Sequence, residues 1–124
     1  MKIIETKTAP AAIGPYSQAM VYGGLAYTSG QIPAVPETGN VVGDSIEAQA
    51  EQSCKNVGAV LAAAGTGYEH VIKTTCFLSD MNDFAAFNAV YEKYFVSKPA
   101  RSCVAVKTLP KNVKCEIEAI AEIL

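Results

Sequence analysis

The sequence has few charges and lacks several residue types on which common sites depend. Only 18% of its 124 residues are charged, it has no tryptophan, and it contains a single arginine, Arg101, and a single histidine, His70. Ten basic and twelve acidic residues give a net charge of −2, and the lysines are scattered along the chain. Proteins that bind nucleic acid through its phosphates concentrate cations on one face. The scarcity and scatter of cations therefore argue against a nucleic-acid partner.

The four cysteines form no recognisable metal or redox motif. Cys54, Cys76, Cys103 and Cys115 are widely spaced, and no Cys-x-x-Cys pair is present. A structural zinc site needs four Cys or His ligands in closely spaced pairs, and His70 alone does not complete one. We expect no metal site and predict that the cysteines are buried free thiols.

Long apolar segments suited to a membrane or to secretion are also missing. Residues 8–36 carry no charge, but four prolines interrupt them, and proline breaks the helix that would have to cross a bilayer. The first residues lack the apolar core and small-residue cleavage site of a secretion signal. We therefore expect no membrane association and a cytoplasmic location.

Half of the residues are hydrophobic, and they follow the periods of short strands and two helices. A chain of this length is sufficient for one domain with its own core, so residues 1–124 are interpreted as a single domain. Asp44 followed by Glu47 is typical of a helix start, and apolar residues then recur at steps of three and four as far as Gly65. A second helix begins near Asn82. The predicted strands cover residues 2–6, 17–22, 25–31, 70–78, 101–107 and 113–123.

This order of elements predicts an α+β fold, a mixed sheet with both helices on one face. The second helix would turn an aromatic row inward, made of Phe84, Phe87, Tyr91 and Phe95. Along residues 113–123, apolar side chains alternate with residues that include Glu116 and Glu118, so one face of this strand is apolar and the other carries carboxylates. No element remains to cover the second face of the sheet. Such an open face favours association with copies of the same chain.

Arg101 is the most informative single residue. It follows Pro99 and Ala100 at the start of an apolar strand. A guanidinium group is planar and forked, and it can hold a carboxylate through two parallel hydrogen bonds. Alternatively, Arg101 forms a structural ion pair with Glu116 or Glu118, which a hairpin between the last two strands would bring alongside. Spacing alone leaves the two interpretations equal.

The other candidate residues are less specific. Glu116 beside a bound substrate would orient or deprotonate a water molecule, although alternating glutamates on a strand are more often a solvated face. Cys103 shares the side of Arg101, but a thiolate nucleophile needs an activating partner, and His70 begins a distant strand. Packing explains the remaining candidates as well as ligand contact does: Tyr16, Ser29, Gly30 and Asn88.

Segments along nearly the whole chain resemble the RidA (YjgF-type) imine deaminase family. The Pro-Ala-Arg and Glu-Ile-Glu-Ala segments are the most specific to it. The matching segments are Ala9-Pro10-Ala11-Ala12-Ile13-Gly14-Pro15-Tyr16-Ser17-Gln18, Thr28-Ser29-Gly30-Gln31-Ile32-Pro33, Lys73-Thr74-Thr75, Asn82-Asp83-Phe84 with Asn88 and Tyr91, Pro99-Ala100-Arg101-Ser102-Cys103-Val104, and Leu109-Pro110 through Glu116-Ile117-Glu118-Ala119.

This resemblance implies a chorismate-mutase-like α+β fold that assembles as a homotrimer, with the sheets lining a central barrel and three ligand clefts between subunits. It also implies a cofactor-free hydrolase. The substrates would be 2-aminoacrylate, through its 2-iminopropanoate tautomer, and 2-iminobutanoate, which are reactive intermediates released by pyridoxal-phosphate enzymes. The products would be 2-oxo acids and ammonia.

Carried over residue by residue, the resemblance makes Arg101 the carboxylate clamp and Glu116 the group that positions the attacking water. Gly30 and Cys103 correspond to backbone contacts with the substrate. Ser29, Tyr16 and Asn88 match other residues of the substrate-binding cleft. Cys115 departs from the family pattern, which usually has an aliphatic residue there, and we expect this change to affect packing rather than chemistry.

Two other functions are alternatives to the deaminase. In the first, this chain has the same fold but binds 2-oxo acids without turnover, as a regulatory or interaction protein. Relatives outside the RidA subgroup often lack the arginine, so Arg101 favours the enzyme. Some relatives have been described as ribonucleases or translation inhibitors, a role for which this composition provides no basic surface.

Overall fold

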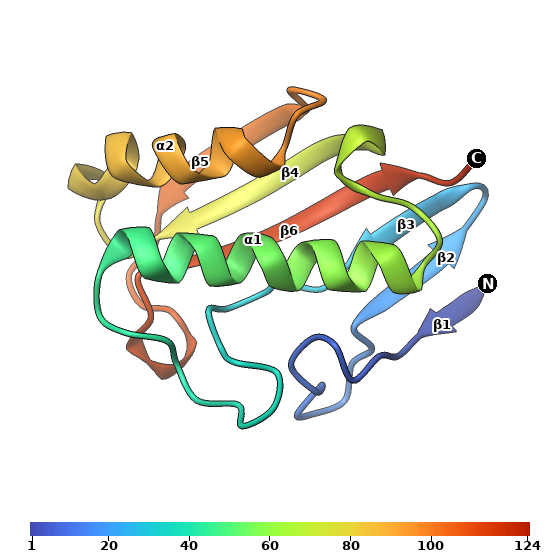
Figure 1. Ribbon diagram of the computed structural model, residues 1–124, viewed down its shortest axis with the longest axis horizontal. Helices are drawn as coiled ribbons and strands as arrows, with labels where there is room; N and C mark the ends of the chain where they lie inside the picture. The colour runs from blue at the N-terminus through green and yellow to red at the C-terminus, as the bar shows by residue number, and fades with distance from the viewer.

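The computed structural model describes residues 1–124 and shows one six-stranded mixed sheet with two helices (Figure 1). The strand order is β1-β2-β3-β6-β4-β5, and every neighbouring pair is antiparallel except β4 and β5. The predicted α+β class is confirmed. The elements are β1 (Lys2–Ile4), β2 (Ala19–Tyr22), β3 (Leu25–Thr28), α1 (Ile46–Ala63), β4 (Val71–Leu78), α2 (Phe84–Tyr94), β5 (Ala100–Ala105) and β6 (Cys115–Glu122).

Helix α1 begins one residue later than the sequence pattern indicates. Ser45 is the N-cap, with an extended backbone (φ −91°, ψ 149°) that lets its side chain accept a hydrogen bond from the N–H of Ala48 at 3.1 Å. The predicted cap at Asp44 is therefore wrong. An N-cap side chain accepts a hydrogen bond from an N–H two or three residues later, and Ser45 is the residue that does so here. The helix ends at Ala63, and Gly65 follows in the left-handed region at φ +88°.

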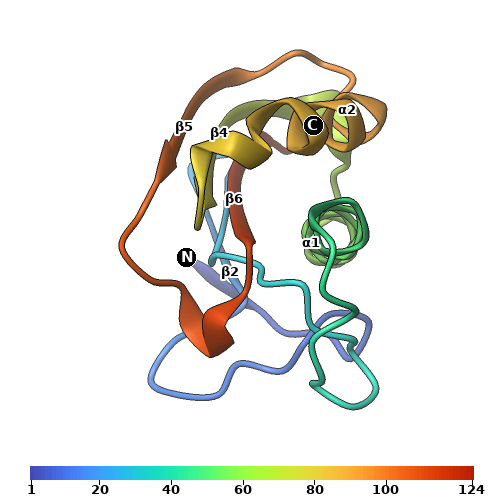
Figure 2. The ribbon, with the colours of Figure 1, turned by 90° about the vertical axis from the view of Figure 1, so that its left-hand side faces the viewer.

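Both helices pack on the same face of the curved sheet (Figure 2). The core between them combines one apolar side of α1, the aromatic row of α2 and alternate residues of β4 and β6. Phe87, Tyr91 and Phe95 of the predicted aromatic row are buried, while Phe84 is partly exposed. No helix covers the opposite face of the sheet, where Glu116 and Glu118 lie in the phase between the buried residues of β6.

Strand β6 is central, and this position corrects one expectation. A hairpin between the last two strands would have placed β5 beside β6, but β4 lies between them. The β4–α2–β5 unit is a crossover, so β5 adds in parallel to the outer edge of β4. Residues 106–114 then cross to the other side of β4, and β6 pairs with both β3 and β4. The wholly buried alternate residues of β6 fit this central place, whereas most of β5 is exposed.

All four cysteines are free thiols, and the predicted burial is confirmed for all of them except Cys103. Cys54, Cys76 and Cys115 are buried in the core, and Cys103 is partly exposed on β5. Burial raises the pKa of the Cys54 thiol far above its usual value, and it raises the pKa of Cys76 and of Cys115 to about 12. These three thiols therefore stay protonated and act as packing groups.

None of the helices has the length and apolarity that crossing a membrane would require. No group of three or more His, Cys, Asp or Glu side chains gathers where it would hold a metal ion.

Candidate functional site

Arg101 carries a partly buried positive charge that lies against aromatic rings. Its guanidinium carbon lies 4.8 Å from the ring centroid of Tyr91 and 5.5 Å from that of Phe84. One guanidinium nitrogen donates a hydrogen bond to the side-chain oxygen of Asn88 at 2.8 Å. A guanidinium has five N–H donors, so most of them remain free. The aromatic faces hold the group by cation–π contact without neutralising it.

The alternative of a structural ion pair is not realised. The oppositely charged side chains that do lie within ion-pair distance are His70 and Glu69, 3.6 Å apart, and Arg101 takes no part in that pair. Arg101 instead borders a cavity of about 610 Å³ together with Asn88, Tyr91 and Lys98. The structure thus leaves a partly buried cation facing open space, which is the arrangement that anion binding needs.

Tyr91 is itself fixed from behind. Its hydroxyl shares a buried hydrogen bond of 2.7 Å with the hydroxyl of Thr74, and its ring stacks on Phe87 and Phe95 with centroids 5.8 and 4.5 Å away. Thr74 is the register partner of Arg101 on β4. Contacts within the core therefore hold the Tyr91 ring in place, and the Arg101 guanidinium lies on that ring.

Replacing Thr74 with valine is expected to destabilise the protein by about 1–3 kcal/mol. The substitution keeps the side-chain shape but leaves the buried hydroxyl of Tyr91 without a partner, and an unsatisfied buried hydroxyl costs that much. Tyr91→Phe removes the hydroxyl, so adding it to Thr74→Val should recover part of the loss. Urea unfolding of the two single variants and the double variant measures the coupling. Equal and additive losses would contradict this account.

Glu116 forms a second candidate group, with Gly30. The two lie so close that a side chain at position 30 would displace the Glu116 carboxyl, because a Cβ there would stand 2.8 Å from its carboxyl carbon. The segment is fixed next to β6 by two backbone hydrogen bonds between Gln31 and Ile117, of 2.7 and 3.1 Å. Glycine at position 30 thus allows the Glu116 side chain to lie directly on the backbone.

The carboxyl group of Glu116 has a raised pKa. Burial is the main cause, and the like charge of Glu118, two residues further along the same face, adds to it. A raised pKa keeps a carboxyl group closer to the range in which it takes up and releases protons at moderate pH. The rise comes from its environment on the open face of the sheet.

A pH-dependent gain in stability is expected on replacing Glu116 with glutamine. A carboxyl whose pKa is raised by folding binds its proton more tightly in the folded state, so its stabilising effect is lost as the pH rises through the folded-state pKa. Glu116→Gln should therefore raise the melting temperature above that pH and leave it unchanged in acid, where Glu116 is already neutral. Thermal unfolding of both proteins from pH 4 to pH 8, by roughly one-unit steps, measures this difference. A constant offset at every pH would contradict it.

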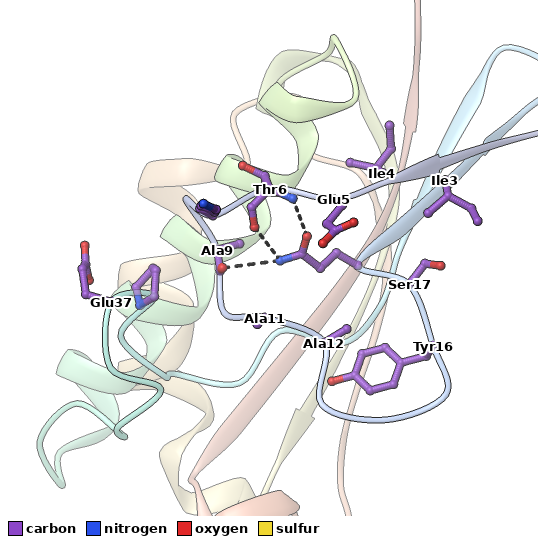
Figure 3. Close-up of a pocket in the computed structure, with 13 residues that line it drawn as sticks. Ile3, Ile4, Glu5, Thr6, Ala9, Ala11, Ala12, Tyr16, Ser17 and Glu37 are labelled. Atoms are coloured by element: carbon purple, nitrogen blue, oxygen red, sulfur yellow. Dashed lines mark hydrogen bonds between the residues drawn. The ribbon is translucent and has the colours of Figure 1, made fainter.

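Ser29 and Tyr16 border the Glu116 group. The hydroxyl of Ser29 donates to the carbonyl oxygen of Ser17 at 2.6 Å. Tyr16 is 52% exposed, and its hydroxyl accepts a long hydrogen bond of 3.4 Å from the N–H of Ile13. Its side chain lines a cavity of about 930 Å³ (Figure 3) and also one of about 370 Å³ that Gly30 lines.

The two groups are not brought together within one chain. Arg101 points towards α2, whereas Glu116 points to the opposite, uncovered face of the sheet. Across β4, Arg101 is in register with Thr74 and Glu116 with Phe77. Two strand spacings and three residues of rise place the two Cα atoms on the order of 14 Å apart. The structural ion pair of Arg101 with Glu116, which adjacent last strands would have allowed, is therefore excluded within one chain.

Cys103 and Asn88 lie with Arg101. Cys103 is two residues from Arg101 on β5, partly buried against the core. Burial raises the pKa of its thiol, and the nearby Arg101 charge only opposes that rise. A protonated thiol is a poor nucleophile, so the structure gives no support to thiolate catalysis. Asn88 points inward from the middle of α2 to accept the hydrogen bond from Arg101.

Several supporting residues were given no role by the sequence pattern. Thr74 and Phe84 hold the Arg101 group, and Gln18 holds the segment before Tyr16. A signal for Thr74 was present, because it falls in the buried phase of its strand with Cys76 and Leu78. A polar residue in such a phase needs a polar partner.

The similarity to known proteins extends over nearly the whole chain. A family model described as endoribonuclease L-PSP matches residues 6–123. A Salmonella typhimurium protein named 2-iminobutanoate/2-iminopropanoate deaminase is 54% identical over 97% of this chain and 96% of its own length. A Lactococcus lactis protein whose name proposes a regulator, AldR, is 57% identical over 99% of this chain and 98% of its own.

The fold is equally close to that of a solved structure. The crystal structure of E. coli TdcF with bound serine superposes with a TM-score of 0.95, at 49% identity and with both chains fully covered. The resemblance found in the sequence segments is thereby confirmed.

Proposed function

This chain belongs to the endoribonuclease L-PSP family, which includes the RidA (YjgF-type) deaminases, and from that membership we propose that it is a 2-iminobutanoate/2-iminopropanoate deaminase. It would hydrolyse 2-aminoacrylate, through 2-iminopropanoate, and 2-iminobutanoate to 2-oxo acids and ammonia. The observation that carries the proposal is the single arginine, left without a carboxylate partner and facing a cavity. The deaminase relative at 54% identity supports it.

Arg101 binds the carboxylate of the substrate in this proposal. Its free N–H donors form two parallel hydrogen bonds to the carboxylate, while Asn88 and the rings of Tyr91 and Phe84 keep the fork in one orientation. Little side-chain entropy remains to be lost on binding, because the protein already orders the guanidinium. The backbone of Cys103, next along the same side of β5, supplies a further contact.

Glu116 positions the water molecule. The carbon of a C=N bond is already electrophilic, so the protein needs chiefly to hold a water molecule in attacking geometry. Water adds to this carbon, its proton passes to nitrogen through the carboxylate, and a tetrahedral amino-alcohol forms. The hydroxyl proton of this intermediate then passes to nitrogen, and ammonia leaves as the C=O bond of the 2-oxo acid forms. The reaction consumes one water and requires neither metal nor organic cofactor. The backbone of Gly30 and the side chains of Ser29 and Tyr16 border the substrate.

Two copies of the chain complete one site in this proposal. Arg101 and Glu116 lie on opposite faces of the sheet, so the Arg101 group of one copy would meet the Glu116 group of the next. A homotrimer with a cleft at each of its three subunit boundaries satisfies this requirement, with the uncovered sheet faces turned to a common central barrel. The exposed apolar residues of the sheet, among them Tyr27 and Val104, favour such burial.

Hydrolysis of a freshly generated imine tests the proposal. A serine or threonine dehydratase produces 2-aminoacrylate or its four-carbon homologue in the cuvette, and the decay of the enamine and imine absorbance is followed with and without this protein. We expect faster decay and a matching release of ammonia. Decay at the uncatalysed rate, with folded protein present in molar excess, would overturn the proposed activity.

A second candidate is a regulatory protein that binds 2-oxo acids without turnover. The relative whose name proposes a regulator, 57% identical, favours this possibility. Isothermal titration calorimetry with 2-oxobutanoate distinguishes the two, when combined with the imine assay. Tight binding without hydrolysis would establish the binding protein, and binding together with hydrolysis would establish the enzyme.

The cellular setting follows from the chemistry. Enamines of this kind arise when pyridoxal-phosphate enzymes eliminate a group from serine or threonine, so this protein would work in the cytoplasm beside such enzymes. Despite the family description, ribonuclease activity is not part of the proposal, because the net charge of −2 and scattered lysines provide no phosphate-binding face.

A further inference from the structure

The segment that carries Tyr16 is closed by the side chain of a single buried glutamine. Residues 5–18 contain no helix or strand, so their backbone groups need other partners. Gln18, which is 3% exposed, supplies them. Its amide nitrogen donates to the carbonyl oxygen of Pro10 at 2.8 Å. The bonds that Figure 3 shows are those to Thr6 and Ala9: the amide nitrogen also donates to the carbonyl oxygens of Thr6 at 3.0 Å and Ala9 at 3.4 Å, and the amide oxygen accepts from the N–H of Thr6 at 2.7 Å.

Only a side-chain amide of this length satisfies that arrangement. The two N–H donors of glutamine face three carbonyl oxygens, of which that of Ala9 is the most distant, and its amide oxygen faces the one N–H. A carboxylate would set an oxygen against the carbonyl oxygens, and a hydrocarbon would leave buried backbone groups unpaired. The bond to Pro10 closes the loop of residues 11–17, on which Tyr16 lies.

The other side of Gln18 is bonded to the Gly30 segment. The backbone oxygen of Gln18 accepts from the N–H of Ser29 at 2.8 Å, and the preceding Ser17 accepts from the Ser29 hydroxyl at 2.6 Å. Ser29 is followed by Gly30, against which the Glu116 carboxyl lies. One residue thus connects the Tyr16 loop, the Ser29–Gly30 backbone and, through it, Glu116.

We propose that Gln18 is a positioning residue that sets Tyr16 and the Ser29–Gly30 backbone relative to Glu116. This inference rests on the proposed function, because it assigns these groups to the substrate cleft. Gln18 touches no substrate and acts through the segments that it holds. A displacement of about 1 Å in such a wall can cost about 100-fold in rate, so we expect the effect on catalysis to exceed the effect of losing an ordinary surface hydrogen bond.

The test compares Gln18→Met, which keeps the volume but removes all four hydrogen bonds, with Thr66→Val as a matched control. Thr66 donates a side-chain hydrogen bond of 2.6 Å to the backbone of Glu122, away from the candidate residues. We expect Gln18→Met to lower kcat/KM by about 10-fold to 100-fold, and amide hydrogen exchange to speed up at residues 6–16 and 29–31. The control should keep wild-type kcat/KM and change exchange only near its own bond.

Exchange and binding separate this inference from the proposed activity. If the wild-type protein hydrolyses no imine, the activity fails, while faster exchange at 29–31 and weaker 2-oxobutanoate binding in Gln18→Met would still support the positioning role. The positioning role would be overturned if Gln18→Met kept the wild-type kcat/KM and left amide exchange at 29–31 unchanged. If the wild-type protein has no activity, unchanged 2-oxobutanoate binding takes the place of kcat/KM in this comparison. Should Gln18→Met not fold, Gln18→Glu, which keeps the length and an acceptor for the Thr6 N–H but removes the donors to the three carbonyl oxygens, gives the same readouts.

Discussion

Replacing Arg101 with alanine is expected to abolish the acceleration of imine hydrolysis almost completely. The substitution removes two charge-assisted hydrogen bonds to the substrate carboxylate, each contributing about 1.5–3 kcal/mol. Since about 1.4 kcal/mol corresponds to a factor of ten, kcat/KM should fall by about 100-fold to 10,000-fold. Stopped-flow decay of a dehydratase-generated imine measures the loss, and 2-oxobutanoate calorimetry should show that binding falls with it.

Two controls show whether the geometry or only the charge of Arg101 matters. Arg101→Lys keeps the charge but loses the planar fork, so it should recover only part of the activity. Lys98→Gln removes another cation that lines the same cavity, and it should leave kcat/KM within about twofold, because rim charges contribute little. Full activity in Arg101→Ala would remove the carboxylate clamp from the mechanism.

Mixing two inactive variants is expected to restore activity. Arg101 and Glu116 point to opposite faces of the sheet, so the proposed site takes the Arg101 group of one copy and the Glu116 group of another. When Arg101→Ala and Glu116→Gln subunits exchange at equal amounts, about a quarter of the clefts in a homotrimer should receive both intact groups. Imine hydrolysis measured before and after subunit exchange, by dilution from mild denaturant, detects this recovery.

The matched control for this experiment is the double variant that carries both substitutions. Mixed with Arg101→Ala, it provides no intact Arg101 in any cleft, so activity should not return. If the first mixture also stayed inactive after verified exchange, the two groups would have to act within one chain. That outcome would contradict the site shared between copies.

The alternation of β6 and the helix periods were readable in the sequence because each depends on local spacing. Ile117 and Ala119 are buried where the alternation predicts, with Glu118 exposed between them. The N-cap shifted by one residue, from Asp44 to Ser45, since both side chains are good caps and only the backbone at position 45 decides between them.

The place of β6 was not readable in this way. Sequence neighbours suggested a hairpin, yet α2 adds β5 in parallel to one side of β4 and thereby leaves the other side to β6. That choice depends on packing over the whole sheet rather than on residues 106–114. It also decides that Arg101 and Glu116 face opposite ways, so the candidate residues were identified while their arrangement was not.

The supports of the site depend on contacts between distant segments, which one sequence does not display. Gln18 bonds to residues eight to twelve positions earlier in an irregular loop, and Thr74 meets Tyr91 across the helix-sheet interface. No periodic pattern encodes such pairs. Each is recognisable only as a polar side chain in an apolar setting, a signal that shows that a partner exists without naming it.

The ordered guanidinium also has a consequence for turnover. In the proposed mechanism it binds a carboxylate, and the substrate imine and the product 2-oxo acid share that group unchanged. The proposed enzyme would therefore experience competitive product inhibition, and accumulating 2-oxo acids would slow the clearance of their own precursors. When 2-oxo acids are abundant, the fraction of sites that they occupy then limits the rate at which a given concentration of imine is cleared.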